Sequence, residues 1–211
     1  MNSQLPTLEP GVTFLDDGDT PAALYRLVGR HLADANGSTY WLDARNAASP
    51  DAIRRHADGR VARSVRVARA FTGYQHYELV RSLPAEVTPR TALVVVPNVA
   101  SLYAEDDVPA FEAEAMFDAT LELLAALADA LAVPVLVTAR ERRDRVRDAA
   151  DRTVTAQRTQ AGLRVDGPSF RTDVYWHDWG FQTTIPYWVD LLGAADADAE
   201  PAPVEPAAPE V

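Results

Sequence analysis

The chain of 211 residues contains no cysteine and no lysine, and it has only four histidines. Without cysteine there is no disulfide framework, no thiolate metal ligand and no thiol nucleophile. Four scattered histidines are too few to replace cysteines as a set of metal ligands, so we expect no bound metal. Without lysine, no ammonium group is available to reach the phosphates of a nucleotide.

Long apolar runs and targeting segments are missing as well. No stretch approaches the roughly 18 consecutive apolar residues of a membrane-spanning helix. The opening MNSQLPTLEP lacks the basic and apolar regions of a signal peptide. We therefore expect a cytoplasmic protein with no membrane contact. Since 47% of the residues are apolar and 24% are charged, the chain can bury an ordinary core.

The charges are unusual in kind. All 20 basic residues are arginines, against 20 aspartates and 11 glutamates, which gives a net charge of −11. An acidic, aspartate-rich and lysine-free composition is typical of proteins from cells with molar internal salt, where acidic side chains keep the surface hydrated and salt screens their repulsion. Adaptation to salt thus explains most of the negative charge. An acidic surface for a basic partner is the alternative interpretation.

Strand-like and helix-like segments alternate over the first two thirds of the chain. The patterns predict strands at 11–15, 38–43, 64–71, 91–96 and 133–138, and helices at 21–33, 50–57, 74–83 and 109–131. Thr20 and Pro21 supply a cap and a first-turn signal for the first helix. The run TALVVV at 91–96 is apolar throughout, as in a strand covered on both faces. This alternation predicts an α/β domain with a mainly parallel sheet flanked by helices.

The pattern changes after residue 138. An arginine-rich stretch at 140–152 precedes short alternating segments, which predict antiparallel strands added to one sheet edge near the C-terminus. From residue 194 onward the chain contains only Ala, Asp, Glu, Pro and Val, which cannot bury enough apolar surface to fold. We expect an N-terminal extension at 1–10, one domain at 11–193 and a disordered acidic tail at 194–211.

Four segments in this order resemble the ATPase core of the RecA/RadA recombinase superfamily, which includes KaiC-like proteins. YWLDARNAASPDAIRR is similar to a strand that ends in an acidic pair before a helix, and VRVARAFTGYQHYELV to the next strand and helix. TALVVVPNVASLY stands where the family has its Walker B strand, and AVPVLVTAR where a strand ends in a polar sensor residue. The resemblance covers residues 11–190 and implies a RecA-like P-loop NTPase fold.

The positions that carry nucleotide chemistry in that family differ here. A P-loop needs several glycines, a lysine and a hydroxyl for Mg²⁺, whereas this chain has LDDGDTPAA. By resemblance, Pro97 replaces the metal-binding aspartate, Arg45 the glutamate that activates water, and Arg140 the sensor glutamine. We therefore expect neither ATP hydrolysis nor a bound cofactor. The predicted degraded nucleotide pocket comprises Asp16, Asp17, Gly18, Asp19, Thr20, Asp43, Arg45, Pro97, Asn98 and Arg140.

Simpler structural roles would also explain these residues. The DDGDT segment would then be a solvated turn whose aspartates favour the positive end of the following helix dipole. Asp43 would be a strand-end carboxylate that accepts hydrogen bonds from a neighbouring turn. Neither role requires a ligand.

Two further groups of residues are candidates for contacts with partners. The family's loop after the fifth strand contacts DNA, so the resemblance implies a nucleic-acid role for Arg142, Arg143, Arg145 and Arg147. Molar salt weakens phosphate contacts, and a solvated helix with ion pairs along its surface is the alternative. Trp176 and Trp179 would serve a protein partner, or pack the edge strands onto the sheet.

The resemblance and the substitutions together predict a catalytically inactive RecA/RadA-like accessory or regulatory protein. We expect it to act with a recombinase-type ATPase in DNA repair or recombination, with single-stranded DNA as a second candidate partner and with homo- or hetero-oligomers both compatible. One alternative is a KaiC-like signalling or scaffold module unconnected with DNA. A residual nucleotide-binding protein with rearranged ligands is the other.

Overall fold

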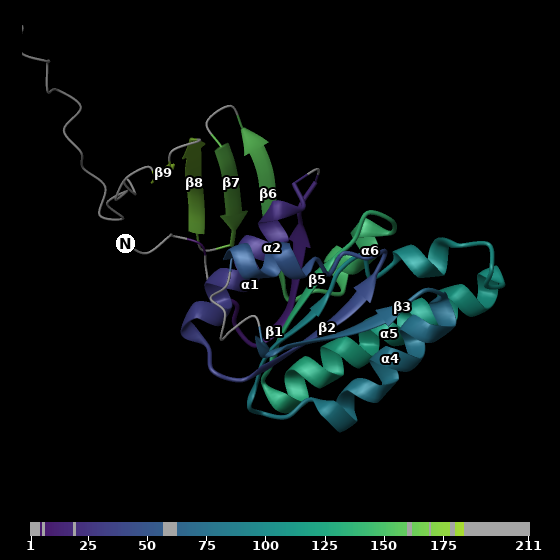
Figure 1. Cartoon of the computed structure of the whole chain (residues 1–211). Coiled ribbons are helices and arrows are strands. Elements are labelled where there is room, and N and C mark those ends of the chain that lie inside the picture. The colour runs from purple at the N-terminus through teal and green to yellow at the C-terminus, as the bar shows by residue number, and fades with distance from the viewer. Residues whose placement is uncertain are drawn as a thin grey trace, which may run out of the picture.

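A computed structural model describes residues 5, 7–18, 20–56, 63–159, 162–168, 170–177 and 180–183. Its strands are β1 (Gly11–Asp16), β2 (Ser38–Ala44), β3 (Val65–Ala70), β4 (Thr91–Val96), β5 (Pro134–Thr138), β6 (Arg152–Thr159), β7 (Gly162–Gly167), β8 (Phe170–His177) and β9 (Gly180–Thr183). Its helices are α1 (Ala22–Asp34), α2 (Pro50–His56), α4 (Gly73–Glu86), α5 (Ala110–Leu131) and α6 (Arg143–Asp148), with a 3₁₀ turn η1 (Ser101–Ala104) (Figure 1).

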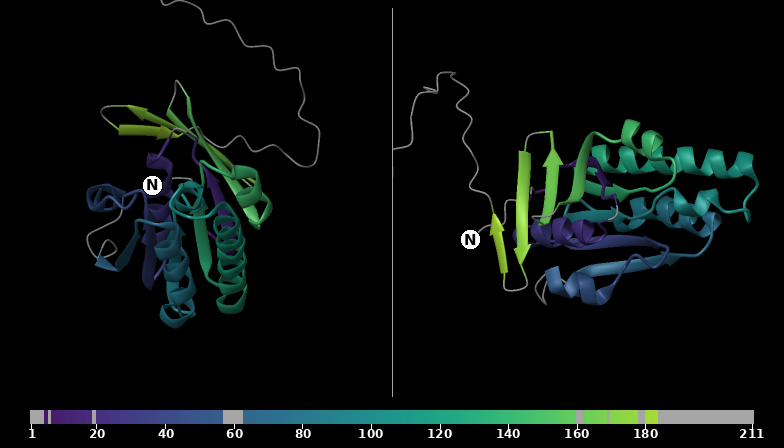
Figure 2. Two further views of the ribbon diagram at one scale, coloured as in Figure 1. Left: turned by 90° about the vertical axis from the view of Figure 1, so that its right-hand side faces the viewer. Right: turned by 90° about the horizontal axis from the view of Figure 1, so that it is seen from above.

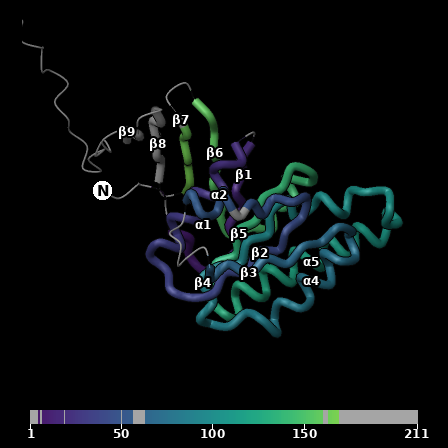
Figure 3. Tube along the Cα trace, viewed as in Figure 1, coloured from purple at the N-terminus to yellow at the C-terminus, as the bar shows by residue number. Residues whose placement is uncertain are grey.

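The described strands form one sheet in the order β3-β2-β4-β5-β1-β6-β7-β8-β9. Every pairing from β3 to β6 is parallel, and β1 lies between β5 and β6. The pairings from β6 to β9 are antiparallel, so these strands extend one edge of the sheet. Figure 3 shows β6 and β7 side by side at this edge. The predicted α/β fold with antiparallel edge strands is thereby confirmed, and the strand order is compatible with a P-loop-like topology.

Helices cover both faces of the parallel part of the sheet (Figure 2). Strand β4 separates two apolar clusters because its side chains alternate between the faces. Leu93 and Val95 pack with the residues of α1, whereas Val94 and Val96 pack with those of α4 and α5. All six residues of β4 are buried, which confirms the prediction of a doubly covered strand.

The N-terminal segment is partly fixed to this domain. Leu8 is buried, and its N–H donates to Nδ1 of His31 on α1 at 3.2 Å. Nε2 of the same ring then carries the proton and donates to the carbonyl oxygen of Ala92 on β4 at 2.9 Å. The predicted extension at 1–10 therefore contributes a contact to the core of the domain.

One predicted helix signal is wrong in detail. Helix α1 has no side-chain cap, and Thr20 accepts the N–H of Ala23 through its backbone oxygen at 2.9 Å. A hydroxyl cap occurs instead at α4, where Thr72 Oγ1 accepts the N–H of Gln75 at 3.2 Å.

In the described part of the chain no helix is both long and apolar enough to cross a bilayer. Asp19, Trp179 and the predicted tail at 194–211 lie outside the described residues.

Candidate functional site

The carboxyl ends of β1, β2, β4 and β5 surround a cleft of about 430 Å³, which we call the strand-end cleft. Parallel strands bring the residues that follow them to one edge of the sheet, and ligands of such sheets bind there. Five of the predicted pocket residues line the cleft, namely Asp17, Arg45, Pro97, Asn98 and Arg140. The structure thus brings together residues that are up to 123 positions apart in the sequence.

The turn between β1 and α1 forms one wall of the cleft. The backbone oxygen of Asp17 accepts the N–H of Thr20 at 2.8 Å, which closes the turn on itself. Gly18 has a φ of +50°, a left-handed conformation that glycine adopts without strain. A phosphate cradle needs several inward-pointing N–H groups, and this short turn already uses one of them internally.

Asp17 is the acidic group of this wall. Burial raises the pKa of its carboxyl group, while the nearby Arg140 guanidinium opposes that shift. Asp17 and Arg140 nevertheless form no ion pair within 4.0 Å. The cleft therefore contains a carboxyl group and a guanidinium that influence each other without touching.

Asp16 points away from the cleft. Its carboxylate pairs with Arg143 and, at 3.5 Å, with Arg147, both on α6. Strand residues two positions apart share a face, and Asp16 lies on the same side as Phe14, over whose ring the Arg147 guanidinium sits at 5.9 Å. Asp16 therefore anchors α6 to the sheet. Although it is predicted as a pocket residue, it does not line the strand-end cleft.

Asp43 has a relative exposure of 1% and does not line the strand-end cleft. It lines another cavity, of about 270 Å³, together with Arg45 and Arg69. One carboxylate oxygen accepts the N–H of Ala48 at 3.0 Å, and the other accepts Nε of Arg69 at 3.0 Å. Both contacts match the simpler role of a strand-end carboxylate that holds a turn. That turn carries Arg45, whose guanidinium pairs with Glu105.

The end of β4 is tied to the end of β5. Asn98, at a left-handed φ of +52°, donates its N–H to Thr138 Oγ1 at 2.9 Å, and the N–H of Val99 donates to the carbonyl oxygen of Thr138 at 2.9 Å. Pro97 precedes this bend, and its side chain offers no metal ligand. No group of His, Asp and Glu side chains in the described part of the chain could hold a metal ion.

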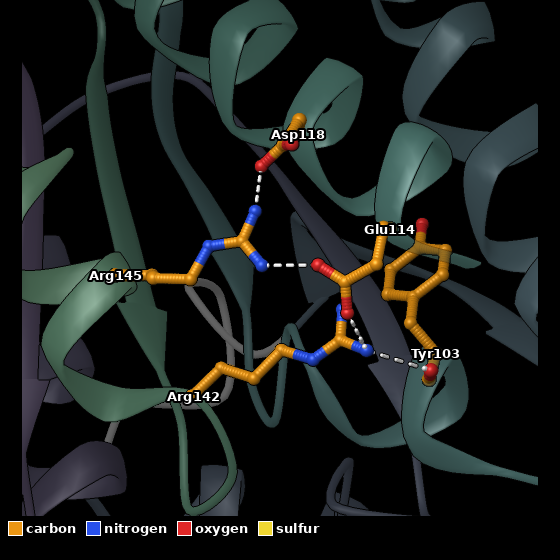
Figure 4. Close-up of polar contacts among 5 residues, drawn as sticks. All are labelled: Tyr103, Glu114, Asp118, Arg142 and Arg145. Carbon is orange, nitrogen blue, oxygen red and sulfur yellow. Dashed lines mark hydrogen bonds and ion pairs between the residues drawn. The ribbon is translucent and has the colours of Figure 1, made fainter. Parts of the chain in front are cut away.

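The arginine-rich segment after β5 is engaged by acidic residues of the same chain (Figure 4). Arg142 pairs with Glu114 at 2.7 Å and donates to the carbonyl oxygen of Tyr103 at 3.2 Å. Arg145 pairs with both Glu114 and Asp118 on α5. Together with the pairs of Arg143 and Arg147 to Asp16, these contacts occupy all four predicted nucleic-acid residues.

Most of these ion pairs join distant parts of the chain. Only the Arg147–Asp144 pair, at 2.6 Å, has the i,i+3 spacing of a solvated helix. The guanidiniums of Arg142 and Arg145 also lie 4.9 and 5.0 Å from the ring centre of Phe117.

Trp176, predicted as a contact for a protein partner, belongs to β8, and its side chain is outside the described part of the structure.

Sequence reasoning missed two features. Ser101 lines the strand-end cleft at 3% exposure, and its Oγ has no hydrogen-bond partner within the described residues. Leaving such a hydroxyl unpaired costs about 1–3 kcal/mol. Three exposed aromatic residues lie at or just before the starts of α4 and α5, and we call them the aromatic patch: Phe71, Tyr74 and Phe111, with exposures of 77, 44 and 75%. The tyrosine hydroxyl donates to Glu112 at 2.5 Å, which joins the starts of α4 and α5.

A buried polar network lies beneath α4 and α5. Nδ1 of His76 contacts the Tyr103 hydroxyl at 2.8 Å, and that hydroxyl contacts Thr120 Oγ1 at 2.8 Å. All three side chains are at most 1% exposed. The network therefore links α4 and α5 to the 3₁₀ turn η1 through side chains shielded from solvent.

Comparison of the chain with protein-family models found no match, and comparison with curated proteins found no related sequence.

Proposed function

We propose that the protein is a RecA/RadA-like domain that does not hydrolyse nucleotides and that acts as an accessory or regulatory partner of a recombinase-type ATPase in DNA repair or recombination. The four resembling segments and the P-loop-compatible strand order support the assignment to this superfamily. Fold alone does not determine activity, so the proposal depends on the strand-end cleft.

The observation that carries the proposal is the set of residues lining that cleft. Asp17, Pro97 and Arg140 all line it. By the resemblance, Asp17 would face the polyphosphate, and Pro97 and Arg140 would replace groups that hold Mg²⁺ or sense the γ-phosphate. At 4 Å, each contact between like charges costs about 1 kcal/mol in water and about 4 kcal/mol near a protein surface. Because Asp17 and Glu141 also offset the guanidiniums of Arg45 and Arg140, the cleft offers a nucleoside triphosphate no net positive charge.

The ion pairs of the arginine-rich segment favour a protein partner over direct DNA contact. A DNA phosphate would have to displace Glu114, Asp118 or Asp16 from a guanidinium that is already neutralised. Molar salt would weaken the replacement contact further. We therefore place the association with DNA in the partner.

The aromatic patch is the surface that best suits such a protein partner. Its two phenylalanines are more exposed than any other large apolar side chains in the described chain. Asp107 lies near Tyr74, and neither Asp106 nor Asp107 forms an ion pair within the described residues. An apolar partner segment that carries arginine would contact both the rings and the carboxylates.

Thermal unfolding in molar KCl with ATP and Mg²⁺ tests the nucleotide part of this proposal. A ligand at about 100 times its dissociation constant adds about 2.7 kcal/mol to the free energy of unfolding. We expect no change in the melting temperature. A clear rise would instead support the residual nucleotide-binding protein.

Purification of the tagged protein from its own cells in molar KCl tests the partner. The parent chain should retain a recombinase-type ATPase, and Phe71→Asp/Phe111→Asp should lose it. The control Val67→Asp changes the remaining exposed large apolar residue, which lies on β3 outside the patch, and should retain the partner. Recovery of only metabolic enzymes or transcription factors would contradict the role in repair and favour the signalling alternative.

A further inference from the structure

The charges that line the strand-end cleft are balanced. Arg45 and Arg140 are opposed by Asp17 and Glu141. A simple anion in this cleft meets two carboxylates, and a simple cation meets two guanidiniums. A molecule that carries one charge of each sign, placed in the right order, meets neither penalty.

Arg140 is the cation most available to such a molecule. It is exposed, and it forms no hydrogen bond or ion pair with any residue of the described chain. Arg45, by contrast, is paired with Glu105. Asp17, the partly buried carboxylate across from Arg140, has no ion-pair partner within 4.0 Å among the described residues. Within the described residues neither side chain forms an ion pair, and the Asp17 carboxyl group has only a hydrogen bond with the backbone of its own residue.

We propose that the strand-end cleft binds a small zwitterion of the α-amino-acid class, whose carboxylate pairs with Arg140 and whose ammonium group pairs with Asp17. The guanidinium fork of arginine suits a carboxylate, and a partly buried carboxylate suits an ammonium group. This site goes beyond the proposed accessory function, which requires only that a nucleoside triphosphate does not bind in the cleft.

Other lining residues select the rest of the ligand. Pro21, Leu24 and Pro97 provide an apolar wall, and Tyr25 adds its ring because its hydroxyl is already bonded to the Ala47 carbonyl oxygen at 2.5 Å. The volume of about 430 Å³ exceeds the needs of the charged groups alone and leaves space for a branched apolar side chain. Glu141 disfavours an acidic one. We therefore expect L-leucine to bind better than L-glutamate.

Thermal unfolding in molar KCl with L-leucine tests the site, and two analogues isolate its charges. 4-Methylpentanoate is leucine without the ammonium group, and 3-methylbutylamine is leucine without the carboxylate. At saturating concentration leucine should raise the melting temperature by about 5 °C, and each analogue should raise it far less. Arg140→Gln and Asp17→Asn should each abolish the effect of leucine. Arg158→Gln, which removes another exposed arginine without a partner in the described chain, should preserve it.

Three results would overturn the proposal. These are an absence of any leucine effect, an equal effect of 4-methylpentanoate, and an equal effect of leucine on all four proteins, which would indicate general solute stabilisation. The comparison of leucine with its analogues uses the parent protein, so it decides the matter even if a variant does not fold. The ATP titration is independent, because amino-acid binding can fail while ATP still produces no shift.

Discussion

Arg69 on β3 donates a hydrogen bond from Nε to the buried carboxylate of Asp43 on the neighbouring strand β2, at 3.0 Å. The Arg69 side chain is 47% exposed, whereas that of Asp43 is fully buried. The second carboxylate oxygen of Asp43 accepts a hydrogen bond from the N–H of Ala48. This carboxylate thus links two strands to the turn that carries Arg45 to the strand-end cleft.

Replacing this buried carboxylate should therefore destabilise the domain. We expect Asp43→Ala to lower the free energy of unfolding by about 2–4 kcal/mol, because it removes two hydrogen bonds and leaves the Ala48 N–H unpaired. Asp43→Asn should cost less, since its amide oxygen can still accept one bond. Urea unfolding at constant molar KCl measures both changes. If Asp43→Ala were as stable as the parent, the carboxylate would not be an anchor.

Gly29 provides a test in which structure and helix propensity disagree. Alanine is favoured over glycine by about 1 kcal/mol inside a helix, so propensity predicts that Gly29→Ala stabilises α1. A Cβ at this position would instead lie 2.0 Å from the carbonyl oxygen of His56, at the end of α2. We expect a net loss of about 1–3 kcal/mol in urea unfolding. A more stable variant would mean that α2 moves away at little cost.

The convergence of the cleft residues can be predicted from the sequence, but the direction of each side chain is harder to foresee. Asp17, Arg45, Pro97 and Arg140 each follow a segment with a clear strand pattern, and parallel strands bring such residues to one edge. Asp16 is grouped with these residues only because it precedes Asp17 in the sequence. The alternation of strand side chains places Asp16 with Phe14 on the opposite face, where α6 is packed.

Contacts between distant segments cannot be predicted in the same way. Arg145 has acidic neighbours at helical spacing, which favours a solvated helix, yet its partners Glu114 and Asp118 lie on α5, 31 and 27 positions away. Nothing local in the sequence marks such a pair. The exposure of Phe71 and Phe111 is equally hidden, because an aromatic residue beside an apolar segment normally indicates a core position.

Releasing the paired arginines should create DNA affinity that the parent lacks. Glu114→Gln/Asp118→Asn removes both carboxylates that neutralise Arg145 and the one that pairs with Arg142. We expect the variant to bind a labelled single-stranded oligonucleotide more tightly, with a salt dependence that is steeper by about 0.7 for each phosphate that a released arginine neutralises. Fluorescence anisotropy over a series of salt concentrations measures this.

A control for that experiment is Glu122→Gln on the same helix, which removes one negative charge where the double variant removes two. Glu122 is exposed and forms no ion pair within the described residues, so its loss changes the net charge of α5 without releasing an arginine. The control should bind DNA as weakly as the parent. Equal binding by the parent and the double variant would show that the ion pairs do not limit access to the arginines.

Buried His76 should make the protein sensitive to mild acid. Burial lowers the pKa of His76 from 6.5 to about 4, because the protonated ring would lose its hydration. Above pH 6.5 the His76 ring is neutral in both the folded and the unfolded chain, so the full contribution of the neutral ring to the free energy of unfolding is present there. It is lost as the pH falls from 6.5 towards 4, since the unfolded chain takes up the proton first. The loss amounts to about 3 kcal/mol, at 1.36 kcal/mol per unit of pKa.

The variant His76→Phe isolates this effect. It removes the titrating ring, so its free energy of unfolding should fall less steeply than that of the parent between pH 6.5 and 4. Some slope should remain, because burial also lowers the pKa of His31. Carboxylates that titrate in this range affect both proteins alike and cancel in the difference. Urea unfolding at each pH gives the two curves, and parallel curves would mean that the His76 ring does not remain neutral in the folded protein at these pH values.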